Sequence, residues 1–267
     1  MGRRLIDDEL WALVEPLLPP DKPRRATHPG RRPVPARTCL VGIVFVLKTG
    51  IPWEDLPAEL GVSGMTCWRR LRDWHAAGVW DKLHAVLLSR LHGADRIDWS
   101  RAVVDSSSVR AMQRGEHTGP SPVDRRKPGT KHHLITDARG IPLAAHITGA
   151  NRHDSTQLRS LVQAVPPVRG RRGRPRRRPK ALLADRGYDA EPHRRWLRTL
   201  RIRPRIARRR TTHGSGLGAE RWVVERTIAW LHQMRRLRTR FERRGDIHQA
   251  FLTLGSALIC WNFLLPT

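Results

Sequence analysis

The chain has 267 residues, which suits one large domain or two smaller ones with a buried core. Its 51 Lys and Arg against 24 Asp and Glu give a formal net charge of +27, and only six of the cations are lysines. A hydrophobic fraction of 39% with ten tryptophans excludes a disordered basic tail. Because arginine binds phosphate with two parallel hydrogen bonds, the composition predicts a folded protein that binds nucleic acid. Ribosomal and nucleoid-packing proteins share such a charge, but they are usually shorter and poorer in tryptophan.

Neither the cysteines nor the apolar stretches indicate a secreted or membrane protein. Cys39, Cys67 and Cys260 are far apart and match neither a disulfide framework nor a zinc site. The first residues contain no apolar signal-peptide core. The longest apolar stretch, 250–265, contains polar residues and is shorter than the roughly 18–20 residues that span a bilayer. We therefore expect a soluble, cytoplasmic protein.

Residues 1–98 are predicted to form a small all-α domain. The periodicity and the positions of proline and glycine predict a polar loop at 19–37 and helices at 5–18, 39–48, 53–60, 64–75 and 79–91. Thr38 is expected to cap the second of these helices, and Gly50 to end it. The helix at 53–60, the glycine turn 61–63 and the basic helix that follows are typical of a helix-turn-helix module.

The helix predicted at 64–75 is the candidate DNA-reading element. Its period places Trp68, Leu71 and Trp74 on one face and leaves three arginines largely outward, namely Arg69, Arg70 and Arg72. An ordinary helical bundle with a solvated basic face is the alternative. The net charge of the chain favours DNA binding.

Residues 99–267 are predicted to form an α/β domain. We expect strands at 101–105, 132–137, 141–147, 180–185 and 202–206, and helices at 153–165, 191–200, 220–237 and 247–263. This order predicts a mixed sheet with helices on both faces. The basic loop 169–180 is either disordered or follows the DNA backbone, through Arg171, Arg172, Arg174, Arg176, Arg177 and Arg178.

Three carboxylates stand where a charge is costly to bury. Asp105 and Asp185 each follow a short apolar strand, and Glu225 follows Trp222-Val-Val in the helix predicted at 220–237. Each could be a structural ion pair, since arginines are abundant. Together they better match a carboxylate cluster that binds two divalent cations about 3.5–4 Å apart for phosphodiester chemistry.

The motifs that contain these residues resemble the transposases of bacterial insertion sequences, in particular the insertion-sequence-5 family. The matching segments are Val103-Val-Asp105-Ser-Ser-Ser, Gly129-Thr-Lys-His-His-Leu-Ile-Thr-Asp137, Asn151-Arg-His-Asp154, Leu183-Ala-Asp185-Arg-Gly-Tyr188, Arg221-Trp-Val-Val-Glu225 and Arg235-Arg-Leu-Arg-Thr-Arg-Phe-Glu-Arg243. The resemblance covers most of the chain, and it includes the segment Ile51-Pro-Trp-Glu-Asp-Leu-Pro.

The resemblance implies a ribonuclease-H-like domain at 99–267 with an Asp-Asp-Glu metal triad, carried here by Asp105, Asp185 and Glu225. It implies a transposase that uses two Mg²⁺ ions, or Mn²⁺, to cut double-stranded DNA at terminal inverted repeats and to join the 3′-hydroxyl end to target DNA. It also implies a homodimer on DNA, associated with the bacterial nucleoid. An inactive DNA-binding regulator and a nuclease of the same fold are the alternatives.

Several further residues have predicted roles around the triad. Related transposases place a Tyr and a Lys on the Glu helix where this chain has Gly218 and His232. Arg221 is one turn before Glu225, so it either clamps a DNA phosphate or pairs with Glu225. Lys131 is either a DNA-backbone contact or a solvated edge residue. Asp154 is expected to cap a helix, and Tyr188, the single tyrosine, is expected to pack rather than to act as a recombinase nucleophile.

Overall fold

The computed structural model describes residues 5–20, 27–28, 32–210 and 218–265. The loop predicted at 19–37 therefore lies partly outside the described residues. The helical N-terminal part contains α1 (Asp8–Val14), α2 (Ala36–Thr49), α3 (Gly64–Ala76) and α4 (Val79–Gly93), with 3₁₀ turns at Glu15–Leu17 and Ala58–Leu60.

Two predictions for this part are wrong in detail, and proline explains both. Helix α2 begins at Ala36 directly after Pro35, so Thr38 lies inside the helix and does not cap it. The helix expected at 53–60 is reduced to the 3₁₀ turn Ala58–Leu60, because a proline at position 57 disfavours a helical conformation of the residue before it. Gly50 ends α2 in the left-handed conformation, with φ of 75°, as predicted.

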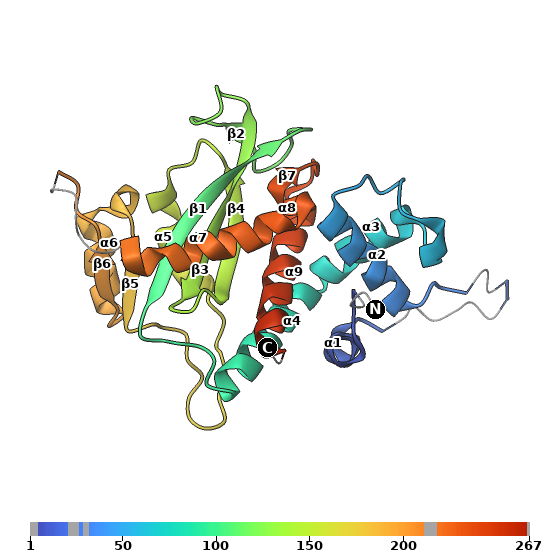
Figure 1. Cartoon of the computed structure of the whole chain (residues 1–267), viewed down its shortest axis with the longest axis horizontal. Coiled ribbons are helices and arrows are strands. Elements are labelled where there is room, and N and C mark those ends of the chain that lie inside the picture. Colours follow the sequence, from blue (N-terminus) through green and yellow to red (C-terminus); the bar gives the residue numbers. More distant parts are fainter. Residues whose placement is uncertain (1–4, 21–26, 29–31, 211–217, 266–267) are drawn as a thin grey trace.

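The C-terminal part is built on one mixed sheet (Figure 1). Its main strands lie in the order β4-β3-β1-β5-β6, with β3 antiparallel to β1 and β5 and β6 parallel to it. This order confirms the ribonuclease-H-like mixed sheet. The strands are β1 (Ala102–Ala111), β2 (Gly119–Pro120), β3 (Pro128–Asp137), β4 (Pro142–Gly149), β5 (Ala181–Ala184), β6 (Arg203–Ile206) and β7 (Thr239–Arg240).

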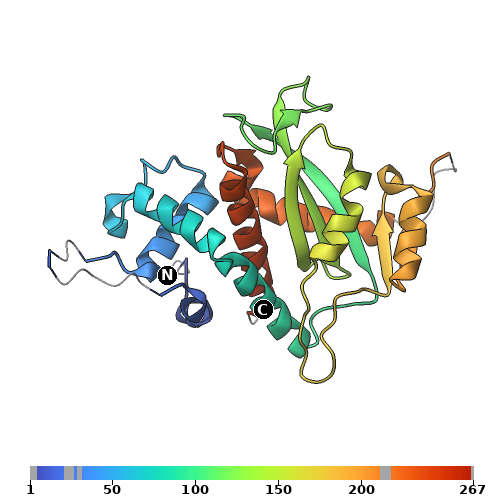
Figure 2. The same cartoon turned by 180° about the vertical axis from the view of Figure 1, so that it is seen from behind.

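Helices cover both faces of the sheet, as predicted. Helix α7 crosses one face over β1 and β3, and Figure 2 shows α5 on the opposite face, against β3 and β4. The helix expected at 220–237 is interrupted at Met234, where the backbone leaves the helical conformation. The helices of this part are α5 (Leu158–Ala164), α6 (Glu191–Thr199), α7 (Gly218–Gln233), α8 (Arg235–Arg238) and α9 (Gly245–Leu264).

Helix α9 joins the two parts through one continuous core. It packs against β4 on one side and against α3 and α4 on the other. At 20 residues it is long and apolar enough to cross a membrane. The expectation from the sequence, that this stretch is too short to span a bilayer, was therefore wrong. However, 78% of its most apolar window is buried inside the protein, which identifies a core helix.

The start of α3 has no space for a side chain. A Cβ at Gly64 would lie 1.7 Å from the backbone oxygen of Trp53. We expect Gly64→Ala to lower the free energy of unfolding by more than about 2 kcal/mol, because a backbone segment has to move. Gly218→Ala is the control: nothing lies near its Cβ position, so alanine should leave stability unchanged or raise it by up to about 1 kcal/mol. Urea denaturation measures both, and an equal effect of the two changes would contradict the close approach.

Candidate active site

The pairing of β1 with β5 places Asp105 and Asp185 side by side. These strands are parallel, with Val103 opposite Leu183, and each aspartate lies two residues beyond that pair. Neighbouring strands are about 4.8 Å apart, so the two carboxylates share one level and one face of the sheet. Asp185 follows the end of β5, as predicted. Asp105 does not end its strand: β1 continues to Ala111 because β3 pairs with it beyond the end of β5.

Glu225 reaches this edge because α7 is fixed to the sheet at two points. Near its N-terminus, Glu220 accepts two hydrogen bonds from the guanidinium of Arg205 on β6, at 2.8 and 2.5 Å. In its second half, the Thr227 hydroxyl donates to the carbonyl of Gly140 in the β3–β4 turn, at 2.6 Å. These contacts hold the helix across β1 and leave the Glu225 side chain exposed.

The carboxylate of Asp105 is partly buried and has two hydrogen-bond donors. Its Oδ1 accepts the Ser106 N–H at 2.8 Å, and its Oδ2 accepts from Arg221 Nη2 at 3.2 Å. Burial nevertheless raises the pKa of Asp105 to about 6, and the negative charges of Asp185 and Glu225 add to the increase. The three carboxylates are therefore close enough to repel one another.

The three side chains do not converge on one point. The carboxylate of Asp185 accepts the Gly187 N–H at 2.8 Å and caps the 3₁₀ turn Arg186–Tyr188. No three or more Asp, Glu, His or Cys side chains in the described part of the chain are gathered closely enough to hold a metal ion. The backbone brings the triad to one sheet edge, where Asp105 and Asp185 contact protein partners and the Glu225 side chain is exposed.

The residues around the triad differ in part from the predictions. Arg221 pairs with Asp105 and not with Glu225, since α7 turns it toward β1. Lys131 is neither solvated nor free of partners: its side chain is 11% exposed and contacts Asp154 at 2.8 Å. Asp154 forms this ion pair and does not cap the helix as expected. The side chain of His153 provides the cap instead, by accepting the Ser155 N–H. Tyr188 is buried, so it packs as predicted.

The three arginines of α3 do not all point outward. Arg69 is exposed, as expected. Arg70 is half-buried and hydrogen-bonds the thiol of Cys39, so its position was predicted wrongly. Arg72 lies over the Trp68 ring, 5.3 Å from its centroid, and donates to Asp73. Of the three, Arg69 is the most accessible to a ligand.

The basic loop 169–180 is an ordered loop that precedes β5. Val168 and Arg176 exchange two backbone hydrogen bonds of 2.8 Å at its base. Arg177 anchors it by donating to the carbonyls of Val165 and Gln163. The other arginines are exposed: Arg171, Arg172, Arg174, Arg176 and Arg178. The loop precedes β5 and Asp185 follows it, so the loop and Asp185 lie at opposite ends of this strand.

A buried polar network behind the triad has no counterpart among the sequence predictions. Arg236 donates to Glu242 at 2.7 Å, Glu242 accepts from His248 Nδ1 at 3.1 Å, and the Nε2 atoms of His248 and His132 are 2.8 Å apart. Burial lowers the pKa of both histidines, so each is neutral at pH 7. The Glu242 contact places the His248 proton on Nδ1, so His132 donates to His248. The sequence signal was the Arg235–Arg243 motif, to which no role was assigned.

A mixed sheet in which β1 lies between antiparallel β3 and parallel β5, with α7 crossing one face, defines a ribonuclease-H-like domain. A family model described as transposase DDE domain matches residues 100–263, and one described as putative transposase of the IS4/5 family matches residues 6–84. The chain belongs to the DDE-domain transposases of insertion sequences.

Two transposases and one solved structure are similar to this chain. The putative transposase for insertion sequence element IS402 of Burkholderia cepacia is 61% identical over 174 residues, which cover 64% of this chain and 81% of that protein. The transposase for insertion sequence element IS1106 of Neisseria meningitidis serogroup B is 29% identical over 117 residues, covering 40% and 37%. The solved Mos1 strand transfer complex aligns over 86% of this chain and 79% of that one, with 12% identity and a TM-score of 0.33.

The raised pKa of Asp105 predicts that Asp105→Asn stabilises the folded protein. The pKa of this carboxyl is about 6 in the folded state and lower in the unfolded state. The free energy of unfolding of the protein therefore falls as the pH rises from about 4 to 6. The amide carries no charge, so at pH 8 the variant should gain about 1–2 kcal/mol, less than the full shift because Arg221 loses its partner. Thermal denaturation at pH 8 and pH 4 measures the gain, which should vanish at pH 4. A gain that persists at pH 4 would contradict this assignment.

Proposed function

We propose that this transposase is a metal-dependent enzyme whose catalytic residues are Asp105, Asp185 and Glu225. The supporting observation is the β1–β5 register, which sets two carboxylates from distant parts of the chain at one level beneath Glu225. Burying Asp105 with Asp185 and Glu225 nearby costs free energy: burial is the main cause of its pKa of about 6, and the two negative charges add to the increase. A bound divalent cation would offset that cost for all three carboxylates, whereas the ion pair with Arg221 involves only Asp105.

The donor set fits Mg²⁺, with Mn²⁺ as an alternative. Both ions prefer oxygen ligands, and the three proposed ligands are all carboxylates. Two bound ions would supply activation of the attacking oxygen and stabilisation of the leaving one. Asp105 would have to exchange Arg221 for the metal, and Asp185 would keep one oxygen on the Gly187 N–H.

The protein's own residues position the DNA strand around this edge. Once released from Asp105, Arg221 faces the site from α7 and is the proposed clamp for a phosphate next to the scissile bond. Arg205 and Thr227 keep α7 in place while this exchange occurs. Water attacks first, and the freed 3′-hydroxyl then attacks target DNA at the same edge.

DNA binding is assigned to surfaces outside this edge. The proposed helical domain, residues 1–98, would recognise the terminal inverted repeats through α3, and the loop 169–180 would contact phosphates without reading sequence. Two DNA ends are joined in one event, so a homodimer on the DNA is part of the proposal. Its substrate places the protein in the cytoplasm, at the nucleoid.

A nuclease of the same fold and an inactive regulator are the alternatives. Strand joining separates the transposase from the nuclease, and strand cleavage separates both from the regulator. All three would share DNA binding, so binding alone does not distinguish them.

Replacing one triad carboxylate by its amide tests the catalytic assignment. Asp185→Asn and Glu225→Gln keep size and hydrogen bonding but remove the charge that would hold the metal. Each should reduce cleavage of a terminal-repeat duplex with Mg²⁺ by more than about 1,000-fold, because removal of one such group costs several kcal/mol of transition-state stabilisation. Strand joining should be lost in parallel, while DNA binding survives.

Asp81→Asn is the matched control for this experiment. Asp81 is an exposed aspartate on α4 outside the proposed site, so its amide should cleave like the wild-type protein. Asp137 is a poor control, since it accepts three backbone N–H groups and its loss would disturb folding. Substantial cleavage by either triad variant, or equal loss in the control, would remove these residues from catalysis.

The two proposed DNA surfaces predict different binding defects. Changing Arg171, Arg172 and Arg174 to Gln should weaken binding to all sequences and lower the log–log salt slope by about 1 per lost phosphate contact. Arg177 is left intact because it anchors the loop. Arg69→Ala should instead lower the preference for terminal-repeat over random DNA by about fivefold or more. Competition binding at several salt concentrations measures both, and an unchanged preference in Arg69→Ala would remove α3 from recognition.

A further inference from the structure

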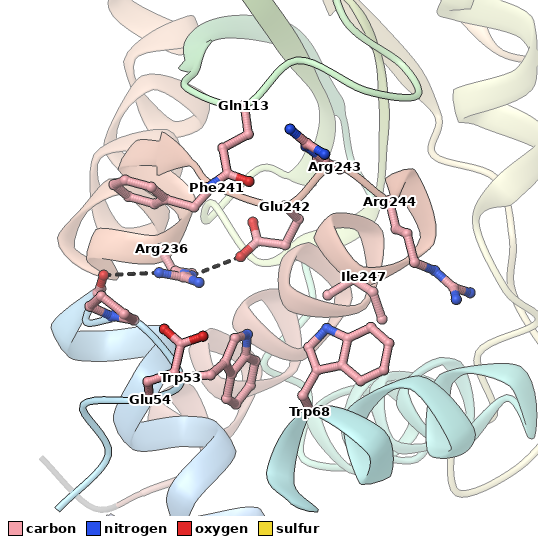
Figure 3. Close-up of a pocket in the computed structure, with 12 residues that line it drawn as sticks. Trp53, Glu54, Trp68, Gln113, Arg236, Phe241, Glu242, Arg243, Arg244 and Ile247 are labelled. Carbon is pink, nitrogen blue, oxygen red and sulfur yellow. Dashed lines mark hydrogen bonds and ion pairs between the residues drawn. The ribbon is translucent and has the colours of Figure 1, made fainter. Parts of the chain in front are cut away.

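A second candidate ligand site lies where the helical part meets the catalytic part. A pocket of about 410 Å³ opens between the segment that follows α2, helix α3, the loop after β1 and the segment 241–244 (Figure 3). Its volume falls in the range of small-ligand sites, roughly 300–1,000 Å³. Gln113, which follows the end of β1 at Ala111, overhangs the pocket, so the part of β1 between Asp105 and Ala111, about 20 Å of strand, lies between the triad and this end of the sheet.

Aromatic rings form one wall of this pocket. Trp53 packs against the buried Phe251 with ring centroids 5.8 Å apart and planes 13° apart, so this ring is held in place from behind. Trp68 of α3 stands beside it and is only partly buried. Both indoles line the pocket, and Phe241 lines its opposite side. Rings fixed in this way provide flat stacking surfaces at little cost in conformational entropy.

The polar groups of the pocket divide into a neutral floor and a charged rim. At the floor, Arg236 and Glu242 neutralise each other at 2.7 Å. At the rim, Arg243, Arg244 and Glu54 are exposed. Arg244 donates two hydrogen bonds to Asp246, at 3.0 and 2.6 Å, and its guanidinium lies over the Trp68 ring, 5.9 Å from its centroid. The side chain of Gln113, which can donate and accept hydrogen bonds, lines the pocket from above.

This combination selects a ligand that is flat, aromatic and joined to an anion. An apolar molecule would not need the arginines, and phosphate alone would not need the rings. Base–aromatic stacking contributes roughly 1–3 kcal/mol per base in single-stranded nucleic acid sites, and arginine supplies the phosphate contact. A paired base cannot enter, because its faces are covered by its neighbours in the duplex.

We propose that this pocket takes one unpaired nucleotide of the bound DNA, with its base against Trp53 and Trp68 and its phosphate at Arg243 and Arg244. The proposal rests on the function proposed above, namely binding of DNA by this chain. It adds a site for a nucleotide removed from the duplex, at the junction of the recognition and catalytic parts. The pocket would be filled only when the DNA is distorted where it crosses this junction.

Binding of two matched duplexes tests this site. One 20-base-pair duplex carries a single bulged 2-aminopurine nucleotide, and the other is fully paired and otherwise identical. The full-length protein should bind the bulged duplex at least about fivefold more tightly, and the 2-aminopurine fluorescence should fall on stacking. Trp68→Ala should remove this preference, whereas Trp68→Phe, which keeps a ring, should retain most of it.

Trp196→Ala is the control, because Trp196 is also half-buried with an arginine over its ring but lies on α6, away from the pocket. It should keep the full preference. Equal affinity of the wild-type protein for the two duplexes, or an unchanged preference in Trp68→Ala, overturns the proposal. Asp185→Asn separates it from the catalytic proposal: that variant should keep the bulge preference whether or not cleavage depends on Asp185.

Discussion

The parallel pairing of β1 with β5 is the constraint on which the site depends. Burial of the apolar residues Ala102–Val104 and Ala181–Ala184 fixes the register of the two strands, and a shift by one residue would turn every side chain to the other face. The same register decides where Asp105 and Asp185 stand. Hydrophobic burial therefore positions the two charged groups, although their mutual repulsion opposes that arrangement.

The contacts next to Asp105 and Asp185 differ from those that hold α7 on the sheet. Arg221 offsets part of the charge on Asp105, and the Gly187 N–H occupies one oxygen of Asp185. Farther out, Glu220 with Arg205 and Thr227 with Gly140 hold α7 against the sheet. The outer contacts are between groups with good partners, whereas the pKa of Asp105 stays raised despite its contact with Arg221. This is the pattern expected where stability is given up locally for function.

Local patterns in the sequence predicted most of the fold. Apolar runs and helical periods located β5, α4 and α9 to within two residues at each end, because these elements bury a whole face. The same patterns gave the three carboxylates, since an acid directly after an apolar run is unusual.

Apart from the two helix boundaries set by proline, the predictions that failed depended on distant contacts. The extension of β1 past Asp105 comes from β3, and the partner of Arg221 was set by the rotation of α7 rather than by spacing along the helix. Lys131 and Asp154 meet from different elements. The buried Arg236–Glu242–His248–His132 network joins α8, α9 and β3, so no single window of sequence contains it.

Arg236 also joins the helical part of the chain to the part that contains the sheet. Its guanidinium donates to the carbonyls of Gly50 and Ile51, at 3.1 and 3.0 Å, while it binds Glu242, and α9 packs against both parts of the chain. The connection from α4 to β1 is itself packed: Ile97 and Trp99 are buried, and the Asp98 N–H donates to Asp137 at 2.8 Å. Under the proposed function, side-chain packing therefore fixes the distance between the DNA sequence bound at α3 and the bond cut at the sheet edge.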